Sequence, residues 1–399
     1  MDVLDGDLVR TVASPLPMGS FARVPLRLTV ACGFVASLLV SASAYAGGMD
    51  PTPERLVLQP KVGGVVQGAG FCQAVAANPA LAAKVGMLPD QLACTPDNVA
   101  FKNLVSELGF ALAPSTMHSA RTTGFGGFVL SLEASYTHIN ADGVSKGADG
   151  SLTQYWHAGT QGSVAPDGTY SAANNSPDSL IGVYTLKARK GLPFGFELDG
   201  AVGYVSNTSL WTIGADLRWA ILEGFRTGPM GYFPDIAIGT GVRTITGSSK
   251  MYLTTVGIDV EASKPITLAD EAVITPYIGY QQLFIYGNSA VLDATPGVNA
   301  MQQCGYTGQQ ASGAPACTNK VATGTAGQTV ANDGDFNNNI TFDPVRIQRN
   351  RGFLGVTYRY ELLYLGAQFL FDLTSPNSID PDLNSTRQWT MSLEGGVFF

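Results

Sequence analysis

Few residues in this 399-residue chain could carry out chemistry. It contains three histidines and five cysteines, so a metal site rich in these ligands is not expected. An acyl hydrolase needs a serine and a histidine in contact, with a polar partner for the histidine. His138 ends an alternating segment, but it shares the apolar face with Tyr136. Because no phosphate-binding glycine motif lies between a strand and a helix either, the sequence predicts no catalytic residue, no metal and no cofactor.

An acidic, amide-rich stretch, NDGDFNNN over residues 332–339, is the best candidate for calcium. An EF-hand loop requires glycine at its sixth position and glutamate at its twelfth. Counted from Asp333, these positions hold Asn338 and Pro344. The pattern favours a solvated loop and leaves only weak calcium binding as an alternative.

The clearest chemical pattern is a set of charges of both signs on the polar face of alternating segments. Alternating residues of a strand point to opposite faces of a sheet, so these charges share one side. Such a mixture suits a wet or ion-paired barrel interior and not a hydrocarbon environment. The candidates are Glu133, Lys187, Arg189, Glu197, Asp199, Asp216, Arg218, Arg243, Asp259, Glu261, Arg359 and Glu394.

The elements that carry these charges are predicted to be strands. The period of two begins near Gly124 and recurs to the last residue, so we expect an all-β, antiparallel, up-and-down barrel of about ten strands, within a range of eight to twelve. The predicted strands cover residues 126–138, 180–190, 194–205, 210–223, 235–245, 251–262, 272–286, 352–360, 362–372 and 387–399. An earlier start is left open for the strand at 352, because the alternation slips around Arg349. The two longest connections, 139–179 and 287–351, fall on the same side.

Composition indicates that the apolar face of this barrel points outward. Charged residues make up 14% of the chain, well under the roughly 25% of soluble domains. Aromatic residues bracket several strands at a spacing of eight, as from Trp211 to Trp219. That spacing spans roughly 20 Å on a tilted strand, close to the apolar band of a transmembrane barrel. The net charge of −8 gives no support for binding nucleic acid.

The amino terminus reads as a secretion signal. Residues 28–42 are almost all apolar, Arg23 and Arg27 precede them, and the sequence Ala-Tyr-Ala over 44–46 follows. We expect residues 1–46 to be this signal, with Met18 as the favoured translation start. Residues 47–123 would then form a periplasmic or lumen-inserted helical head with a linker, and residues 124–399 the barrel.

Within the head, Phe101, Leu104, Val105 and Leu108 follow the period of a helix. Thr95 or Asp97 is expected to cap this helix, and Gly109 or Pro114 to end it. An earlier helix is expected over residues 71–85.

Four cysteines remain after the signal. In an exported protein, an even number favours disulfides. Short loops favour the pairs Cys72–Cys94 and Cys304–Cys317, with four free thiols as the alternative.

The carboxy-terminal sequence WTMSLEGGVFF resembles the signature of bacterial outer-membrane β-barrel proteins, which close with an amphipathic strand and a terminal aromatic residue. The resemblance covers the signal and the barrel and names no specific family. It implies residence in the bacterial outer membrane, contact with lipid and lipopolysaccharide, and recognition by the barrel-assembly machinery.

Two functions are compatible with this sequence. The leading expectation is a narrow pore or small-solute channel, gated by the amino-terminal segment. The alternative is a non-conducting surface barrel, an adhesin, receptor or anchor, whose long loops 139–179 and 287–351 bind a partner. Arg346, Arg349 and Arg351 are candidate contacts for lipopolysaccharide phosphates. The oligomeric state does not follow from the sequence.

Overall fold

The computed structural model describes residues 48–58, 61–62, 65–66, 95–146, 152–159, 176–224, 232–268, 272–293, 306–309, 315–317 and 339–399. The expected signal, the helix over 71–85, and Cys72, Cys94 and Cys304 lie outside these residues. Cys317 lies on a short strand, but its side chain is not described. The signal and both disulfides therefore stay predictions.

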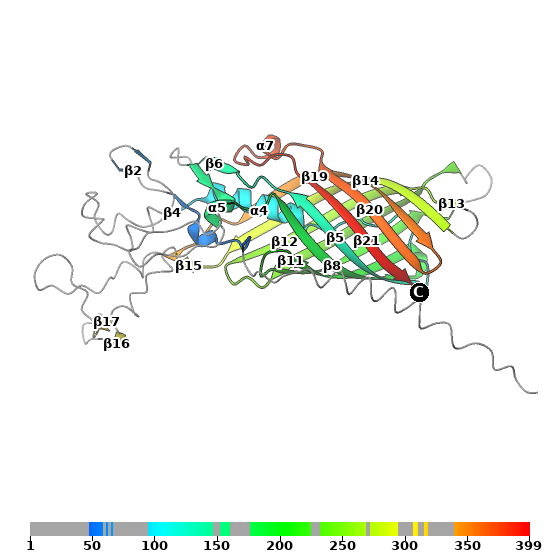
Figure 1. The fold of residues 1–399 in the computed structure, drawn as a ribbon, viewed down its shortest axis with the longest axis horizontal. Helices are drawn as coiled ribbons and strands as arrows, with labels where there is room; N and C mark the ends of the chain where they lie inside the picture. Colours follow the sequence, from blue (N-terminus) through cyan, green and yellow to red (C-terminus); the bar gives the residue numbers. More distant parts are fainter. Residues whose placement is uncertain are drawn as a thin grey trace, which may run out of the picture. The chain divides into compact units, whose positions relative to one another are not determined.

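Ten antiparallel strands form a closed barrel, as predicted (Figure 1). Each strand pairs with its neighbours in the sequence, and the last pairs with the first, from Thr390 opposite Thr137 to Phe398 opposite Val129. The barrel strands are β5 (Phe128–His138), β8 (Leu180–Gly191), β9 (Phe196–Val205), β10 (Trp211–Leu222), β11 (Asp235–Thr246), β12 (Met251–Ser263), β14 (Ala272–Ser289), β19 (Val345–Tyr360), β20 (Leu363–Asp372) and β21 (Trp389–Phe398).

The remaining elements are short and lie outside the ten barrel strands. The strand β13 (Ile266–Leu268) extends the sheet at one edge of β14, and the others form small pairs or single turns. They are η1 (Pro53–Arg55), β1 (Val57–Leu58), β2 (Lys61–Val62), β3 (Val65–Val66), β4 (Thr95–Pro96), β6 (Val144–Lys146), β7 (Leu152–Gln154), α5 (Tyr155–Gly159), η3 (Pro193–Gly195), β15 (Leu292–Asp293), β16 (Tyr306–Gln309), β17 (Pro315–Cys317), β18 (Asn339–Ile340) and α7 (Pro376–Ile379).

The outer face of the barrel is apolar. Leu198, Ile213 and Leu217 alternate with buried neighbours and are each 43–51% exposed. Aromatic side chains meet across strands near both ends, Tyr204 with Trp211 at 5.2 Å between ring centroids and Phe196 with Trp219 at 5.7 Å. An apolar band between two aromatic girdles is the surface that a lipid bilayer requires. The protein is an outer-membrane β-barrel.

The amino-terminal part forms a helix, α4 (Asn98–Leu112), at the end of the barrel from which the long connections emerge (Figure 1). The Asp97 carboxylate caps it by accepting a hydrogen bond from the amide of Ala100 at 2.9 Å, as predicted. The helix passes Gly109 and ends before Pro114, which cannot continue it. Among the described residues, no helix is both long and apolar enough to cross a membrane.

Residues 113–123, the lumen segment, connect α4 to the start of β5 at the opposite end of the barrel. The chain therefore runs through the interior from the mouth with long connections to the mouth with short turns. We call the first the loop mouth and the second the turn mouth.

Candidate functional site

The charges predicted from the alternation pattern lie inside the barrel, with one exception. Ten of the twelve side chains are buried, and Asp216 is half-buried. Glycines on the wall give them room: a Cβ at Gly241 would lie 1.9 Å from Asp216 Oδ1, and one at Gly239 would lie 2.7 Å from Asp259. The glycines on the wall thus leave the space that the inward charged side chains fill.

Most of these charges are paired across strands. Lys187 bridges Glu133, Arg189 bridges Glu394 at 3.1 Å, and Arg218 bridges Glu261 at 2.8 Å. Arg243 holds Asp216 with two guanidinium nitrogens, at 2.8 and 2.5 Å. Breaking a buried pair by removing one partner typically costs about 3–5 kcal/mol, so this network fixes the shape of the interior.

The lumen segment occupies the space that the wall leaves. Its backbone carbonyls at Pro114, Thr116 and Met117 accept hydrogen bonds from Arg351 (2.9 Å), Gln368 (2.9 Å) and Tyr364 (2.8 Å). Buried backbone carbonyls need hydrogen-bond donors, and here side chains of the barrel wall donate the hydrogen bonds that neighbouring strands would donate in a sheet.

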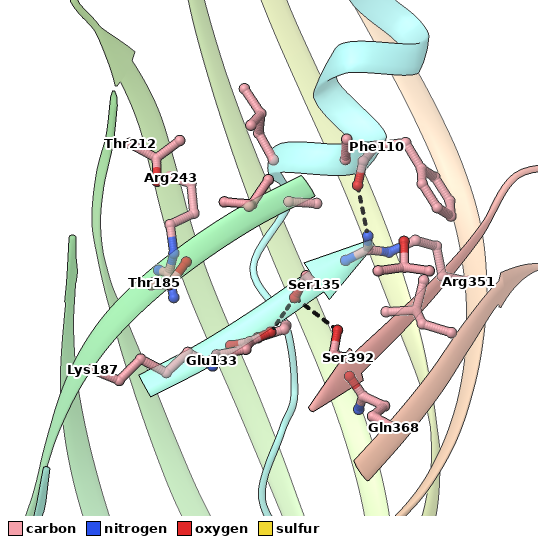
Figure 2. A pocket seen from close by; sticks show the side chains of 17 residues that line it. Phe110, Glu133, Ser135, Thr185, Lys187, Thr212, Arg243, Arg351, Gln368 and Ser392 are labelled. Carbon is pink, nitrogen blue, oxygen red and sulfur yellow. Dashed lines mark hydrogen bonds and ion pairs between the residues drawn. The ribbon is translucent and has the colours of Figure 1, made fainter. Parts of the chain in front are cut away.

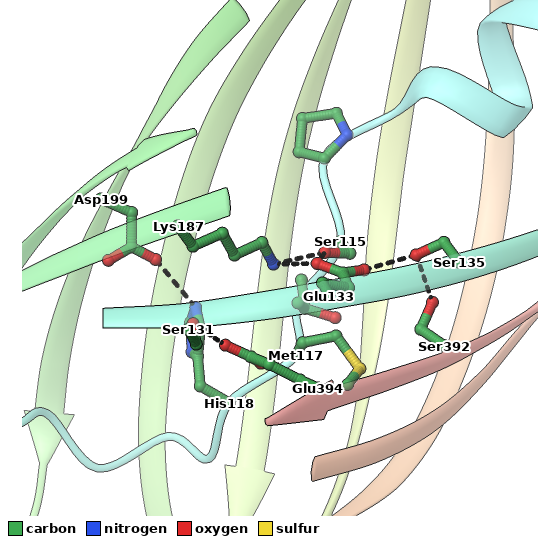
Figure 3. A network of polar contacts seen from close by, with 12 residues as sticks. Ser115, Met117, His118, Ser131, Glu133, Ser135, Lys187, Asp199, Ser392 and Glu394 are labelled. Atoms are coloured by element: carbon green, nitrogen blue, oxygen red, sulfur yellow. Dashed lines mark hydrogen bonds and ion pairs between the residues drawn. The ribbon is translucent and has the colours of Figure 1, made fainter. Parts of the chain in front are cut away.

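Side chains of the lumen segment join the same network (Figure 3). Ser115 donates to Glu133 at 2.8 Å and accepts from Lys187 at 2.7 Å. Nearer the turn mouth, the amide of Thr123 donates to Glu197 at 2.7 Å. The segment is thus bound along its length to several different strands.

Arg349 and Arg351 do not contact lipopolysaccharide; that prediction is wrong. Strand β19 begins at Val345, seven residues before the predicted start, and the inward register therefore includes both arginines. Each is 1% exposed, and both guanidinium groups lie over the ring of Phe110, at 4.5 and 5.0 Å from its centroid. Arg349 pairs with Asp372, and Arg351 binds Gln281, so they fasten α4 to the wall.

Arg359 is the exception among the predicted lumen charges. It keeps the inward register, but it stands one residue from the end of β19, where the strand leaves the lumen at the turn mouth. Its side chain is exposed and stacks on Phe398 at 3.7 Å. Arg346 is exposed at the loop-mouth end of β19, so its contact with lipopolysaccharide stays a prediction.

Above the lumen segment, Glu107 of α4 joins the helix to the first long connection. The carboxylate accepts hydrogen bonds from Tyr155 Oη (2.8 Å), Trp156 Nε1 (2.7 Å) and the amide of Asn140 (3.2 Å). The side chain is fully buried. Burial raises the pKa of Glu107 to about 7, although its donors and the nearby Arg349 oppose the shift.

Together, α4 and residues 48–58 contact all five connections at the loop mouth. We call this assembly the cap. The contacts are Glu107 with Tyr155, Met49 with Asn207 (3.0 Å), Glu54 with Lys250, Asn98 with Asp343 (2.6 Å) and Lys102 with Asp382 (3.1 Å).

Little space remains between cap and wall. The cavity beneath α4, lined by Phe110, Lys187, Arg243 and their neighbours, holds about 30 Å³, room for one or two water molecules (Figure 2).

The sequence leaves residues 47–123 open between the periplasm and the lumen, and it identifies neither the extended segment 113–123 nor the anchor at Glu107. Residues 113–123 have no periodicity of either kind, because an extended chain surrounded by wall on all sides has no apolar stripe. Glu107 lies within a predicted amphipathic helix, where a carboxylate is ordinarily solvated. The missed signal was the low charge of the helix, in which Lys102 and Glu107 are the only charges.

No protein-family model matches the chain, and no curated protein matches it. Solved structures match about 70% of the chain. Ail, the attachment invasion locus protein of Yersinia pestis, is 10% identical, with 69% of this chain and 99% of Ail covered and a TM-score of 0.23. The outer membrane protein OprG of Pseudomonas aeruginosa is 11% identical over 71% and 99%, with a TM-score of 0.27. The COG4313 outer membrane channel of Pseudomonas putida is 11% identical over 72% and 100%, also at 0.27. Similarity at this level does not bear on the function of this chain.

Proposed function

We propose that the protein is a non-conducting outer-membrane barrel that anchors the cap at the cell surface. One observation carries this proposal: the amino-terminal segment passes through the lumen and closes the loop mouth by contacts to all five connections. Long connections lie outside the cell in outer-membrane barrels and short turns face the periplasm. The cap, and with it residues 48–58, then faces the medium.

The filled interior favours an anchor over a pore. A pore needs a continuous wet path, whereas here wall charges pair with each other and wall amides bind the lumen segment. Surface loops on a rigid scaffold commonly carry binding. The long connections within the predicted ranges 139–179 and 287–351 remain the proposed binding surface, except for residues 345–351, which belong to β19.

A gated pore is the second candidate, and one observation favours it. The lumen segment is held by side-chain hydrogen bonds and not by a strand ladder, so its release would leave the barrel intact. The charged wall would then line a narrow channel whose selectivity comes from those charges.

Two measurements test the proposal. In planar bilayers, the purified full chain should show no stable conductance; steady single-channel steps from the wild-type protein would favour the pore instead. An epitope tag placed directly before Gly48 should bind antibody on intact cells.

The matched control for the second measurement is the same tag inserted after Glu361, in the turn between β19 and β20. It should be detected only after the outer membrane is permeabilised. If the tag before Gly48 also required permeabilisation, the cap would face the periplasm and the anchor proposal would fail.

A further inference from the structure

Three potential metal ligands meet where the lumen segment passes β9. Glu197 and Asp199 are two residues apart on that strand, so both point inward. His118 comes from the lumen segment, and its Nε2 lies 3.6 Å from Asp199 Oδ2 (Figure 3). One ligand atom from each of the three lies within 4.8 Å of the other two.

Two atoms of this cluster are unsatisfied. His118 Nδ1 and Asp199 Oδ1 have no hydrogen-bond partner. His118 is 6% exposed and Asp199 is 3% exposed, so solvent does not replace the missing partners. A buried polar atom without a partner carries a desolvation cost. A cation bound by the Asp199 carboxylate would offset that cost at the carboxylate, whereas His118 Nδ1 is the ring nitrogen that does not face Asp199.

The surrounding charge favours a cation. Of the twelve predicted charges, seven acids and four bases lie inside the barrel, and Arg349, Arg351 and Asp372 add two bases and one acid, so acids still outnumber bases. Lys187, Arg189 and Arg218 are bound to Glu133, Glu394 and Glu261. Glu197 and Asp199 form none of the Lys or Arg bridges found among the described residues.

The donor set selects the kind of cation. One imidazole nitrogen and two carboxylate oxygens suit a divalent first-row transition metal, and zinc takes these ligands at about 2.0–2.2 Å. Ligand atoms around a tetrahedral zinc ion lie about 3.3 Å apart, close to the 3.6 Å between His118 and Asp199.

We propose that His118, Glu197 and Asp199 bind a divalent transition-metal ion that fastens the lumen segment to β9. The sequence predicted no metal, because the chain has only three histidines and five cysteines, whereas this site combines one histidine with two strand carboxylates. The inference does not depend on whether the barrel conducts.

Zinc is the probe. The full chain is refolded into detergent with or without Zn²⁺, because the enclosed site fills only as the barrel forms, and then dialysed against a chelator. Elemental analysis should find about one zinc per chain in the wild-type protein. The variants His118→Ala and Asp199→Asn should retain at most a tenth of that amount, whereas His157→Ala, a histidine on α5, should retain all of it.

Cobalt gives an independent readout. Refolding with Co²⁺ should give the visible absorption of a four- or five-coordinate ion in the wild-type protein and not in His118→Ala. If Asp199→Asn does not fold, His118→Ala still tests the site, because it removes a side chain of the lumen segment and leaves the hydrogen bonds between the strands intact. No retained zinc in the wild-type protein, or equal retention by His118→Ala, would overturn the proposal.

Discussion

At the scale of single residues, Glu107 makes the attachment of the cap depend on pH. Its ordinary pKa is 4.5 and burial raises it to about 7, so between these values the folded protein binds a proton that the unfolded chain has lost. The contribution of Glu107 to the free energy of unfolding therefore falls as pH rises from about 4.5 to about 7 and is constant above that. Between these two pH values the contribution falls by roughly 3 kcal/mol.

We accordingly expect amide hydrogen exchange in α4, corrected for the intrinsic effect of pH, to speed up between pH 5 and 7. Glu107→Gln keeps the size of the side chain and an acceptor for Trp156 but does not titrate. Its corrected exchange should be independent of pH in this range. The same pH dependence in both proteins would exclude Glu107 as the cause.

Two glycines let α4 approach β14 closely, one from each side. A Cβ at Gly109 of the helix would lie 2.4 Å from Ile285 Cγ2, and a Cβ at Gly287 of the strand would lie 2.5 Å from Val105 Cγ1. Neither residue has a positive φ, so the requirement is for space and not for backbone freedom.

Gly109→Ala should therefore destabilise the cap, by roughly 1–3 kcal/mol of overpacking. The sign is informative, because alanine in a helix is otherwise better than glycine by about 1 kcal/mol. Urea denaturation followed by protease sensitivity of α4 measures the change. The added substitution Ile285→Ala removes the clashing atom, so the double variant should lose less free energy of unfolding than the two single variants lose together. A loss in the double variant that is larger than this sum would contradict the packing.

At the scale of elements, the strands and their inward charges were predictable, and the course of the lumen segment was not. Alternation fixed the frame of segments such as β5 and β10, where every second residue faces lipid. It failed at β19, because Arg346, Arg349 and Arg351 resembled a charged rim. The inward pairing of Arg349 with Asp372 depends on a strand 23 residues away in the sequence, which a local pattern does not contain.

The lumen segment shows the same limit more clearly. Pro114 and Thr116 read as part of an ordinary connection, because partners that hold them, such as Gln281 and Gln368, come from strands more than 160 residues later. Cap and wall recognise each other through tertiary contacts alone. The Asp97 cap, by contrast, is local and was predictable.

At the scale of the whole molecule, we expect closure to depend on the arginine that binds both α4 and the lumen segment. Arg351 donates to the carbonyls of Phe110 (3.3 Å) and Pro114 (2.9 Å) and also to Gln281. Arg351→Met keeps a side chain of similar length without these donors. We expect it to loosen the lumen segment and to produce transient conductance steps in planar bilayers.

The control is Arg346→Met, which removes an exposed arginine from the same strand and should leave the membrane sealed. If Arg351→Met stayed silent while gel mobility showed an intact barrel, closure would rest on the remaining hydrogen bonds of the lumen segment.

The course of the lumen segment also constrains how the molecule is made. The polypeptide is threaded through a ring whose two ends, β5 and β21, join along one seam. A bore of ten strands already filled by side chains is too narrow to admit a folded helix afterwards. The seam must therefore close around a lumen segment that is already in place. The final pairing of Phe128 with Phe399 is then the step that traps this segment inside the barrel.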